Sequence, residues 1–212
     1  SLIKSAAFIT YKDKVLPLHR GYPMPVEFTE HTVHSTLFQS IDWLVKNMRK
    51  DGSFLYYYDG IKDTEVDFLH PRMVDPLYYN ILRHSGGTIT LLRGFELSKN
   101  RQYLDAAKDS IDFFVSTLRS HQYKGANACY PFFNKKSKLG GAGVGLVALM
   151  HYYLQTDSNY YRKETDGLVR HILSRIEDDG EMIGYYIHPL YNNGKALTHL
   201  SENDKKALFS FY

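Results

Sequence analysis

The sequence contains an internal repeat, and this feature constrains the fold more than any motif does. Residues 82–118 align without a gap with residues 140–176, 58 positions later in the 212-residue chain. The aligned apolar residues are Leu92, Phe95, Ile111, Phe114, Val115 and Leu118 with Met150, Tyr153, Val169, Ile172, Leu173 and Ile176. Because their spacing is helical over two successive segments, the repeated unit is predicted to be a helical hairpin.

A third copy of the second helix precedes these two. Ile41, Leu44, Val45 and Met48 align, 70 positions earlier, with Ile111, Phe114, Val115 and Leu118. Helices are predicted over residues 30–50, 81–98, 102–119, 139–155 and 160–176, with a sixth beginning at Ser201. The expected fold class is therefore all-α, built from repeated antiparallel helical hairpins over residues 30–212. Residues 1–29 have short β-prone runs and three prolines, and are predicted to form an extended lead-in arm.

The connections between the predicted helices alternate in length. Short turns, residues 99–101 and 156–159, join the helices within a hairpin, whereas residues 51–80, 120–138 and 177–200 form long loops between hairpins. Successive connections in antiparallel helices fall on opposite ends, so the long loops are predicted to gather on one face. Loops of this length are usually functional or disordered, and their Tyr, His and Pro content favours an ordered, functional face.

Composition excludes some classes of function. The formal net charge is +3, and no run of Lys or Arg exceeds two residues, so no nucleic-acid partner is expected. Cys129 is the only cysteine, which excludes an intrachain disulfide and argues against a cysteine-based zinc site. No apolar run is long enough for a membrane span, and the first residues lack a signal-peptide core. The compartment, either cytoplasmic or exported with a signal removed, and the oligomeric state stay open.

Two segments resemble a known class of protein. LLRGFELSKNRQYLDAAKDSIDFFV and LVALMHYYLQTDSNYYRKETDGLVRHIL are similar to the hairpin of α/α-toroid enzymes, in which a short polar turn leads into a Tyr-Leu-x-x-Ala helix. This superfamily includes six-hairpin glycosidases, toroid polysaccharide lyases and N-acylglucosamine 2-epimerase-like proteins, and no single family is assigned. The resemblance covers residues 30–212 and implies an (α/α) toroid. A closed toroid of this class has about six hairpins, so the chain is expected to be a fragment of a larger one.

Loop 51–80 combines six carboxylates with seven aromatic residues. Aromatic rings stack on sugar faces, and a carboxyl group in an apolar setting keeps a raised pKa and can donate a proton. Asp67 and Asp75 are the predicted catalytic pair, because they approach the start of the helix at residue 81. The alternative is a solvated acidic loop whose tyrosines pack on the core.

Further candidate site residues lie where two helices begin. Arg83 could hold a carboxylate or sulfate and His84 could act as a general base, and the alternatives are an Arg83–Asp75 salt bridge and a backbone-bonded histidine. Lys138 precedes a glycine-rich segment without a phosphate-loop pattern, whose glycines are predicted to allow close helix packing, as Gly86 and Gly87 would. The other predicted substrate-binding residues are Tyr78, Tyr79, Asn80, Tyr185 and His188.

Two functions follow from these residues. The first is a carbohydrate-active protein that acts on a polysaccharide or glycan by acid/base chemistry, with no cofactor and no metal. It would hydrolyse the glycan, cleave it by elimination or epimerise it. His31 and His34 have helical spacing but no third ligand, so they are predicted to be ordinary surface histidines. The second function is a non-catalytic helical-repeat scaffold that binds a glycan or peptide.

Overall fold

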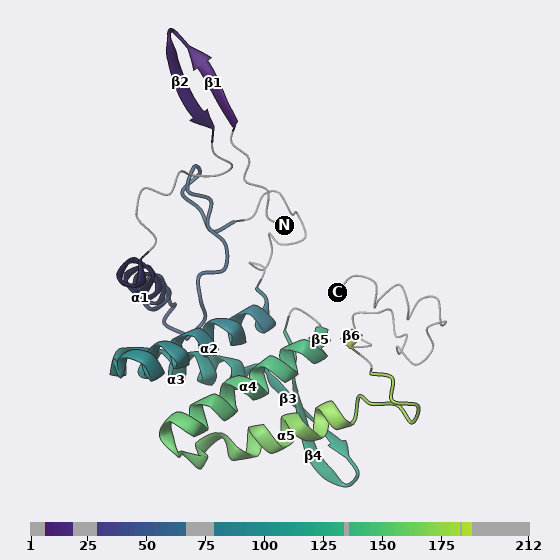
Figure 1. Ribbon diagram of the computed structural model, residues 1–212. Helices are drawn as coiled ribbons and strands as arrows, with labels where there is room; N and C mark the ends of the chain where they lie inside the picture. Colours follow the sequence, from purple (N-terminus) through teal and green to yellow (C-terminus); the bar gives the residue numbers. More distant parts are fainter. Residues whose placement is uncertain (1–6, 19–28, 67–78, 134–135, 183, 188–212) are drawn as a thin grey trace. The chain divides into compact units, whose positions relative to one another are not determined.

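The computed structural model describes residues 7–18, 29–66, 79–133, 136–182 and 184–187 (Figure 1). The chain divides into two compact units, Ser1–Gln39 and Ser40–Tyr212. Within the described ranges there are five α-helices and three two-stranded antiparallel sheets. The predicted all-α toroid is therefore wrong, and the chain is a mixed α/β protein. The prediction failed because segments assigned to the lead-in arm, to a helix end and to loops form paired strands.

The first unit contains a β-hairpin. β1 (Ala7–Tyr11) pairs with β2 (Lys14–Leu18), with Ala7 opposite Leu18 and Tyr11 opposite Lys14. The two turn residues, Lys12 and Asp13, have positive φ angles of 46° and 61°. Positive φ at both central residues is the turn geometry whose twist matches that of paired strands. The hairpin lies in the range predicted to be an extended lead-in arm.

Helix α1 (Glu30–Lys46) is shorter than the predicted range of 30–50, and Ile41 is its one buried residue. The chain then turns, and Met48 forms a β-bridge with Phe54. Gly52, between them, has a φ angle of +86°, and a Cβ atom at this position would overlap the backbone oxygen of Asp109. Only glycine combines this conformation with such a close approach.

Both predicted helical hairpins are present, and they have the same turn chemistry. α2 (Ile81–Ser98) ends at Lys99, which has a left-handed conformation, and Asn100 caps α3 (Arg101–Ser116). α4 (Leu139–Thr156) ends at Asp157, also left-handed, and Ser158 caps a short 3₁₀ helix, η2 (Asn159–Tyr161), that leads into α5 (Arg162–Leu173). The paired signals, a left-handed residue and then a capping side chain, explain why each hairpin turns within a few residues.

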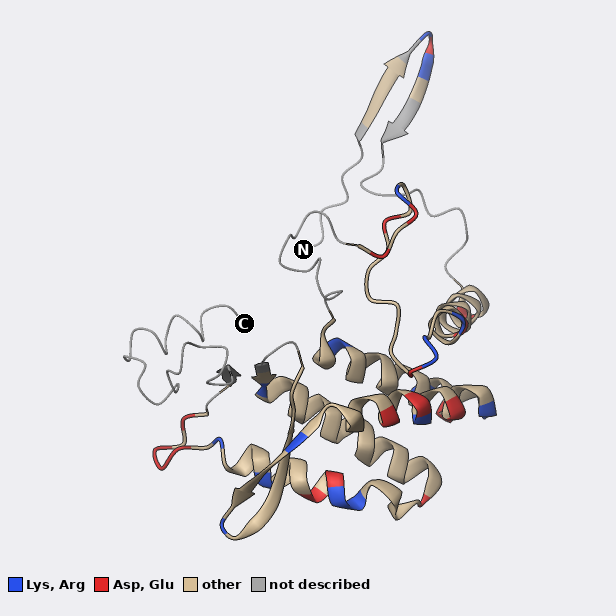
Figure 2. Cartoon of the chain, turned by 180° about the vertical axis from the view of Figure 1, so that it is seen from behind, with Lys and Arg blue, Asp and Glu red and all other residues tan. Residues whose placement is uncertain are grey.

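α2 packs against both α3 and α4, and the core lies among these three helices. Glycines let the helices approach closely: a Cβ atom on Gly87 would contact the Phe54 ring, and one on Gly145 would overlap the Phe114 ring. Charged residues gather on α3 and α5, whereas α4 has none (Figure 2). The buried apolar residues of these helices include Ile81, Leu91, Leu92, Ile111, Phe114, Ala142, Leu149 and Leu168.

A hydrogen bond of the same kind joins successive helices. The hydroxyl of Tyr103 on α3 donates to Asp42 of α1 at 2.6 Å, and that of Tyr161 donates to Asp112 of α3 at 2.5 Å. Tyr161 lies 58 positions after Tyr103, and Asp112 lies 70 positions after Asp42. These are the two repeat spacings of the sequence, so the repeat preserves an interhelical contact as well as a hydrophobic pattern.

Strands replace helix ends and loops elsewhere. β3 (Leu118–Tyr123) and β4 (Ala126–Pro131) form a hairpin that packs against α5, with Lys124 and Gly125 at its turn. Both turn residues have positive φ angles, 48° and 77°. β5 (Lys136–Lys138) pairs with β6 (Tyr185–Ile187). In the sequence, β5 precedes the second helical hairpin and β6 follows it.

Candidate functional site

The first turn of α2 carries three of the predicted site residues. Asn80 is the N-cap of this helix, and its Oδ1 accepts a hydrogen bond from the backbone N–H of Leu82 at 3.1 Å. An asparagine at this position satisfies an N–H group that has no partner within the helix. The Asn80 side chain therefore fixes where α2 begins and so positions Arg83 and His84.

His84 is buried, with 2% of its surface exposed. Its Nε2 lies 2.8 Å from the carbonyl oxygen of Ser110, and its Nδ1 lies 2.7 Å from the hydroxyl oxygen of Tyr79. Because a carbonyl oxygen can only accept, Nε2 carries the proton and Nδ1 accepts from Tyr79. Burial lowers the pKa of His84 to about 4. The residue is therefore a neutral, backbone-bonded histidine, which is the alternative to its predicted role as a general base.

Tyr79 connects His84 to the loop that follows α1. The Tyr79 hydroxyl accepts a hydrogen bond from the backbone N–H of Phe54 at 2.9 Å, in addition to donating to His84. Its ring packs against Tyr56, Phe113 and Phe133, with ring centroids 5.6 to 5.8 Å away. Burial raises the pKa of Tyr79 to about 12, so the hydroxyl keeps its proton at neutral pH.

Two hydroxyl groups complete this network on the side of α3. Thr88 Oγ1 donates to the carbonyl oxygen of His84 at 3.1 Å, and the Ser110 hydroxyl lies 2.6 Å from Thr88 Oγ1. Every described buried side-chain nitrogen and oxygen has a hydrogen-bond partner. The chain from Phe54 through Tyr79, His84 and Ser110 thus ties the loop, α2 and α3 together.

Arg83 is exposed and lies beside Tyr56 of the loop. Its Nη1 is 3.2 Å from the Tyr56 hydroxyl, and its guanidinium carbon is 5.7 Å from the centre of the Tyr56 ring. A guanidinium held against an aromatic face is preorganised, because the stacking restricts an otherwise flexible side chain. The predicted salt-bridge partner, Asp75, lies outside the described residues.

Lys138 and Tyr185 are brought together by the β5–β6 pair, in which they are directly opposite each other. Lys138 occupies the N-cap position of α4 without a side-chain capping bond, and the N–H of Leu139 donates to Gly184 at 2.8 Å. The first turn of α4 packs on that of α2, since a Cβ atom on Gly140 would contact Leu82. The structure therefore places the beginnings of α2 and α4 together, with Arg83 on the side of the Tyr56 loop.

The described carboxylates that follow α1 hold the loop in shape. Asp51 accepts from the N–H and the hydroxyl of Ser53 at 3.0 and 2.7 Å, and Asp59 accepts from two backbone N–H groups at 3.0 and 3.2 Å. Burial alone would raise the pKa of Asp51, but the hydrogen bonds from Ser53 and the charge of Arg49 lower it. Glu65 is paired with Arg49. These contacts correspond to the alternative stated for the loop, a solvated acidic segment.

The remaining predicted residues fall into two groups. Asp67, Asp75, Tyr78 and His188 lie outside the described residues, so their predicted roles stay predictions. His31 and His34 are exposed on α1. Among the residues that the structure describes, no three His, Cys, Asp or Glu side chains are grouped so that they could hold a metal ion.

Comparison with known proteins does not assign the chain to a family. No protein-family model matches the chain, and a search of curated proteins finds no relative. The resemblance to toroid enzymes therefore stays a prediction at the level of sequence, while the all-α fold that it implied is wrong. In the described ranges, none of the helices combines the length and the apolar character needed to cross a membrane.

A pair of histidines that the sequence did not suggest lies between β3 and α5. His121 Nε2 is 3.1 Å from His171 Nδ1, and the ring of Tyr130 packs against both imidazoles. Burial lowers the pKa of His171 to about 3, with His121 and Arg175 contributing, and burial also lowers the pKa of His121. The two residues are 50 positions apart in elements predicted as a loop and a helix, so no sequence spacing indicated their contact.

Cys129 is held in the same region. Its thiol lies 3.5 Å from the carbonyl oxygen of Glu164, and Gly167 of α5 packs against its sulfur. Burial raises the pKa of Cys129 to about 11, which opposes formation of the reactive thiolate. This environment is typical of a structural cysteine.

Proposed function

We propose that this chain is a carbohydrate-active protein that binds an acidic, uronate-bearing glycan where α2 and α4 begin. The observation that carries the proposal is the exposed guanidinium of Arg83, held against Tyr56 at the first turn of α2. A planar guanidinium can donate two parallel hydrogen bonds to a carboxylate. The exposed part of a tyrosine ring beside it suits the apolar face of a sugar.

The surroundings of Arg83 support an anionic ligand. The N-terminal ends of α2 and α4 lie together, and backbone N–H groups at helix N-termini favour negative charge. Lys138 adds a cationic residue at the beginning of α4. An arginine at a helix N-terminus is itself disfavoured by the helix dipole, so a carboxylate ligand would supply a reason for its position.

Binding can be tested with the full chain and an oligogalacturonate, using its methyl ester as the uncharged control. We expect Arg83→Gln to weaken binding of the acid by roughly 10- to 150-fold, since a charge-assisted hydrogen bond contributes about 1.5 to 3 kcal/mol. Arg93→Gln is the matched control, because Arg93 is also exposed on α2 but lies three turns further along. Equal binding of acid and ester, or equal loss in both variants, would contradict the proposal.

Catalysis needs a separate measurement, because the predicted catalytic pair, Asp67 and Asp75, lies outside the described residues. Hydrolysis of the oligogalacturonate creates new reducing ends, whereas elimination also creates an unsaturated product that absorbs ultraviolet light. If the chain is an enzyme, Asp67→Asn and Asp75→Asn should abolish turnover while leaving binding at Arg83 intact. Binding without any turnover would support the second function, a non-catalytic glycan-binding scaffold.

A further inference from the structure

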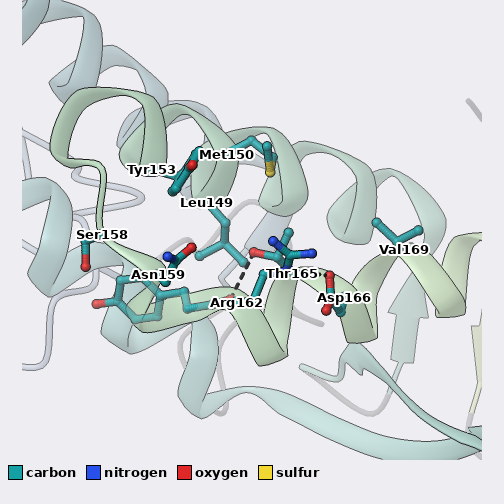
Figure 3. Close-up of a pocket in the computed structure, with 10 residues that line it drawn as sticks. Leu149, Met150, Tyr153, Ser158, Asn159, Arg162, Thr165, Asp166 and Val169 are labelled. Carbon is teal, nitrogen blue, oxygen red and sulfur yellow. Dashed lines mark hydrogen bonds and ion pairs between the residues drawn. The ribbon is translucent and has the colours of Figure 1, made fainter.

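A pocket of about 280 Å³ lies between α4 and α5, near the short turn that joins them (Figure 3). Leu149, Met150 and Tyr153 line it from α4, and Thr165, Asp166 and Val169 line it from α5. Figure 3 shows these side chains from the two helices facing a common space, with Arg162 at its edge. Arg162 Nε donates to Asp166 Oδ1 at 3.0 Å.

The same positions of the first hairpin are fully covered. Counting back 58 residues, Met150, Tyr153 and Val169 correspond to Leu92, Phe95 and Ile111. The first three are 41%, 36% and 39% exposed, whereas their counterparts are 0%, 9% and 1% exposed. The second hairpin therefore has an apolar face of the kind that the first hairpin buries.

The second hairpin packs on the first hairpin and buries this apolar face. α4 packs along α2, Gly145 of α4 receives the Phe114 ring of α3, and Tyr161 is hydrogen-bonded to Asp112. In the part of the chain that the structure describes, no element plays this role for α4 and α5. The two helices carry three further exposed apolar residues, Val147, Leu154 and Leu173.

One other stretch of the sequence matches the part of α4 that provides this cover. Residues Ala207–Tyr212 read Ala-Leu-Phe-Ser-Phe-Tyr, and residues Ala148–Tyr153 read Ala-Leu-Met-His-Tyr-Tyr, 59 positions earlier. Within α4, Ala148, Leu149 and Tyr152 are buried. Residues 201–212 lie outside the described residues.

We propose that the exposed face of α4 and α5, including the pocket, binds residues 201–212 of the same chain. The segment offers an alanine, a leucine and a phenylalanine, Phe211, with the spacing of the buried α4 residues Ala148, Leu149 and Tyr152. Burying the exposed apolar side chains of the face is favourable because it removes apolar surface from water. The inference concerns a surface away from Arg83 and does not depend on the proposed glycan function.

The proposal can be tested by photo-cross-linking in the full chain. In a Cys129→Ala background, Val169→Cys is labelled with a benzophenone reagent, irradiated, and the cross-linked peptide is identified by mass spectrometry. The matched control is Asp105→Cys, which places the same reagent at an exposed position of α3. We expect residues 201–212 to be cross-linked from position 169 at least five times as often as from position 105.

Two further measurements decide which molecule supplies the segment and whether its apolar residues matter. In a mixture of ¹⁴N- and ¹⁵N-labelled protein, binding within one chain gives cross-links of a single isotope. Mixed-isotope products as the main species would show a second copy on this face and overturn the proposal. Phe211→Asp should lower the yield from position 169 several-fold, and an unchanged yield, or no excess over position 105, would also overturn it.

Discussion

At the scale of single residues, the hydroxyl of Tyr79 is the most constrained polar group in the described core. It accepts from the N–H of Phe54 and donates to Nδ1 of His84. Removing one oxygen atom would therefore leave a donor and an acceptor buried without hydrogen bonds. Such groups are expensive because folding has already removed them from water.

Tyr79→Phe should accordingly lower the free energy of unfolding by about 2 to 4 kcal/mol, the cost of two unsatisfied buried groups. Urea unfolding followed by circular dichroism gives the change as a shift in midpoint at constant slope. Tyr58→Phe is the control, since Tyr58 is 52% exposed and its hydroxyl contacts the exposed carboxylate of Asp63. A similar small effect for both variants would show that the buried network contributes little.

The buried histidines make stability depend on pH. The pKa of His84 is lowered to about 4 and that of His171 to about 3, mainly by burial, while the unfolded chain titrates near 6.5. Between these values the unfolded state binds more protons, so the free energy of unfolding falls as the pH decreases below 6.5. Each histidine contributes at most about 1.4 kcal/mol per pH unit.

We therefore expect the chain to be about 2 to 4 kcal/mol less stable at pH 5 than at pH 7.5. Urea midpoints measured across this range test the expectation. His31→Gln should leave the pH dependence unchanged, because His31 is exposed on α1. Midpoints that stay constant down to pH 5 would mean that both imidazoles bind protons in the folded state as readily as in the unfolded chain.

At the scale of elements, glycines decide how closely the helices pack, and α4 offers a direct comparison. Gly143 has no atom within 4 Å of a potential Cβ, whereas at Gly145 a Cβ atom would overlap the buried Phe114 ring. Helix propensity favours alanine over glycine by about 1 kcal/mol at both positions. The two substitutions should therefore differ in sign.

Gly143→Ala should raise the free energy of unfolding by up to about 1 kcal/mol, and Gly145→Ala should lower it by about 1 to 3 kcal/mol, the usual cost of overpacking a core. Thermal and urea unfolding of the two variants beside the unchanged protein measure this difference. Equal effects would mean that α4 can move away from α3 at little cost.

Helical periodicity predicted the helices well but carried no information on short strands. The bounds of α2 match the predicted 81–98, and the structure shows the reason: Asn80 caps its first turn and Lys99 has a left-handed conformation at its end. Residues 118–131 were divided between a helix end and a loop, although Lys124-Gly125 can adopt the positive φ angles of a tight hairpin turn. The failure at the level of fold class comes from extending a true repeat over segments that do not belong to it.

At the scale of the whole molecule, burial is distributed unevenly. α2 and α3 have eight and seven buried residues, whereas α1 has only Ile41. Local opening is easiest where few apolar contacts must be broken. Amide hydrogen exchange should therefore be slowest in residues 91–95 and 106–111 and fastest, among the helices, in residues 31–38. Mass-spectrometric exchange at neutral pH measures this order, and protection of α1 equal to that of α2 would contradict it.

The candidate site could be predicted only where local signals sufficed. The sequence placed Asn80, Arg83 and His84 in one helical turn, and the structure has them there. It could not predict that His84 points to Ser110 or that Arg83 lies against Tyr56, because these partners are 26 and 27 residues away in sequence and depend on packing. The pocket between α4 and α5 was missed because exposure of a repeated apolar position cannot be recognised from the repeat itself.

Gly167 packs closely against the sulfur of Cys129, so the sole cysteine is a probe of local opening between α5 and β4. Cys129 is half-buried, and its sulfur becomes fully accessible to a thiol reagent when α5 separates from β4. The rate of modification, compared with the rate in denaturant, therefore reports how often α5 and β4 separate. No fluorophore or tag has to be introduced to follow it.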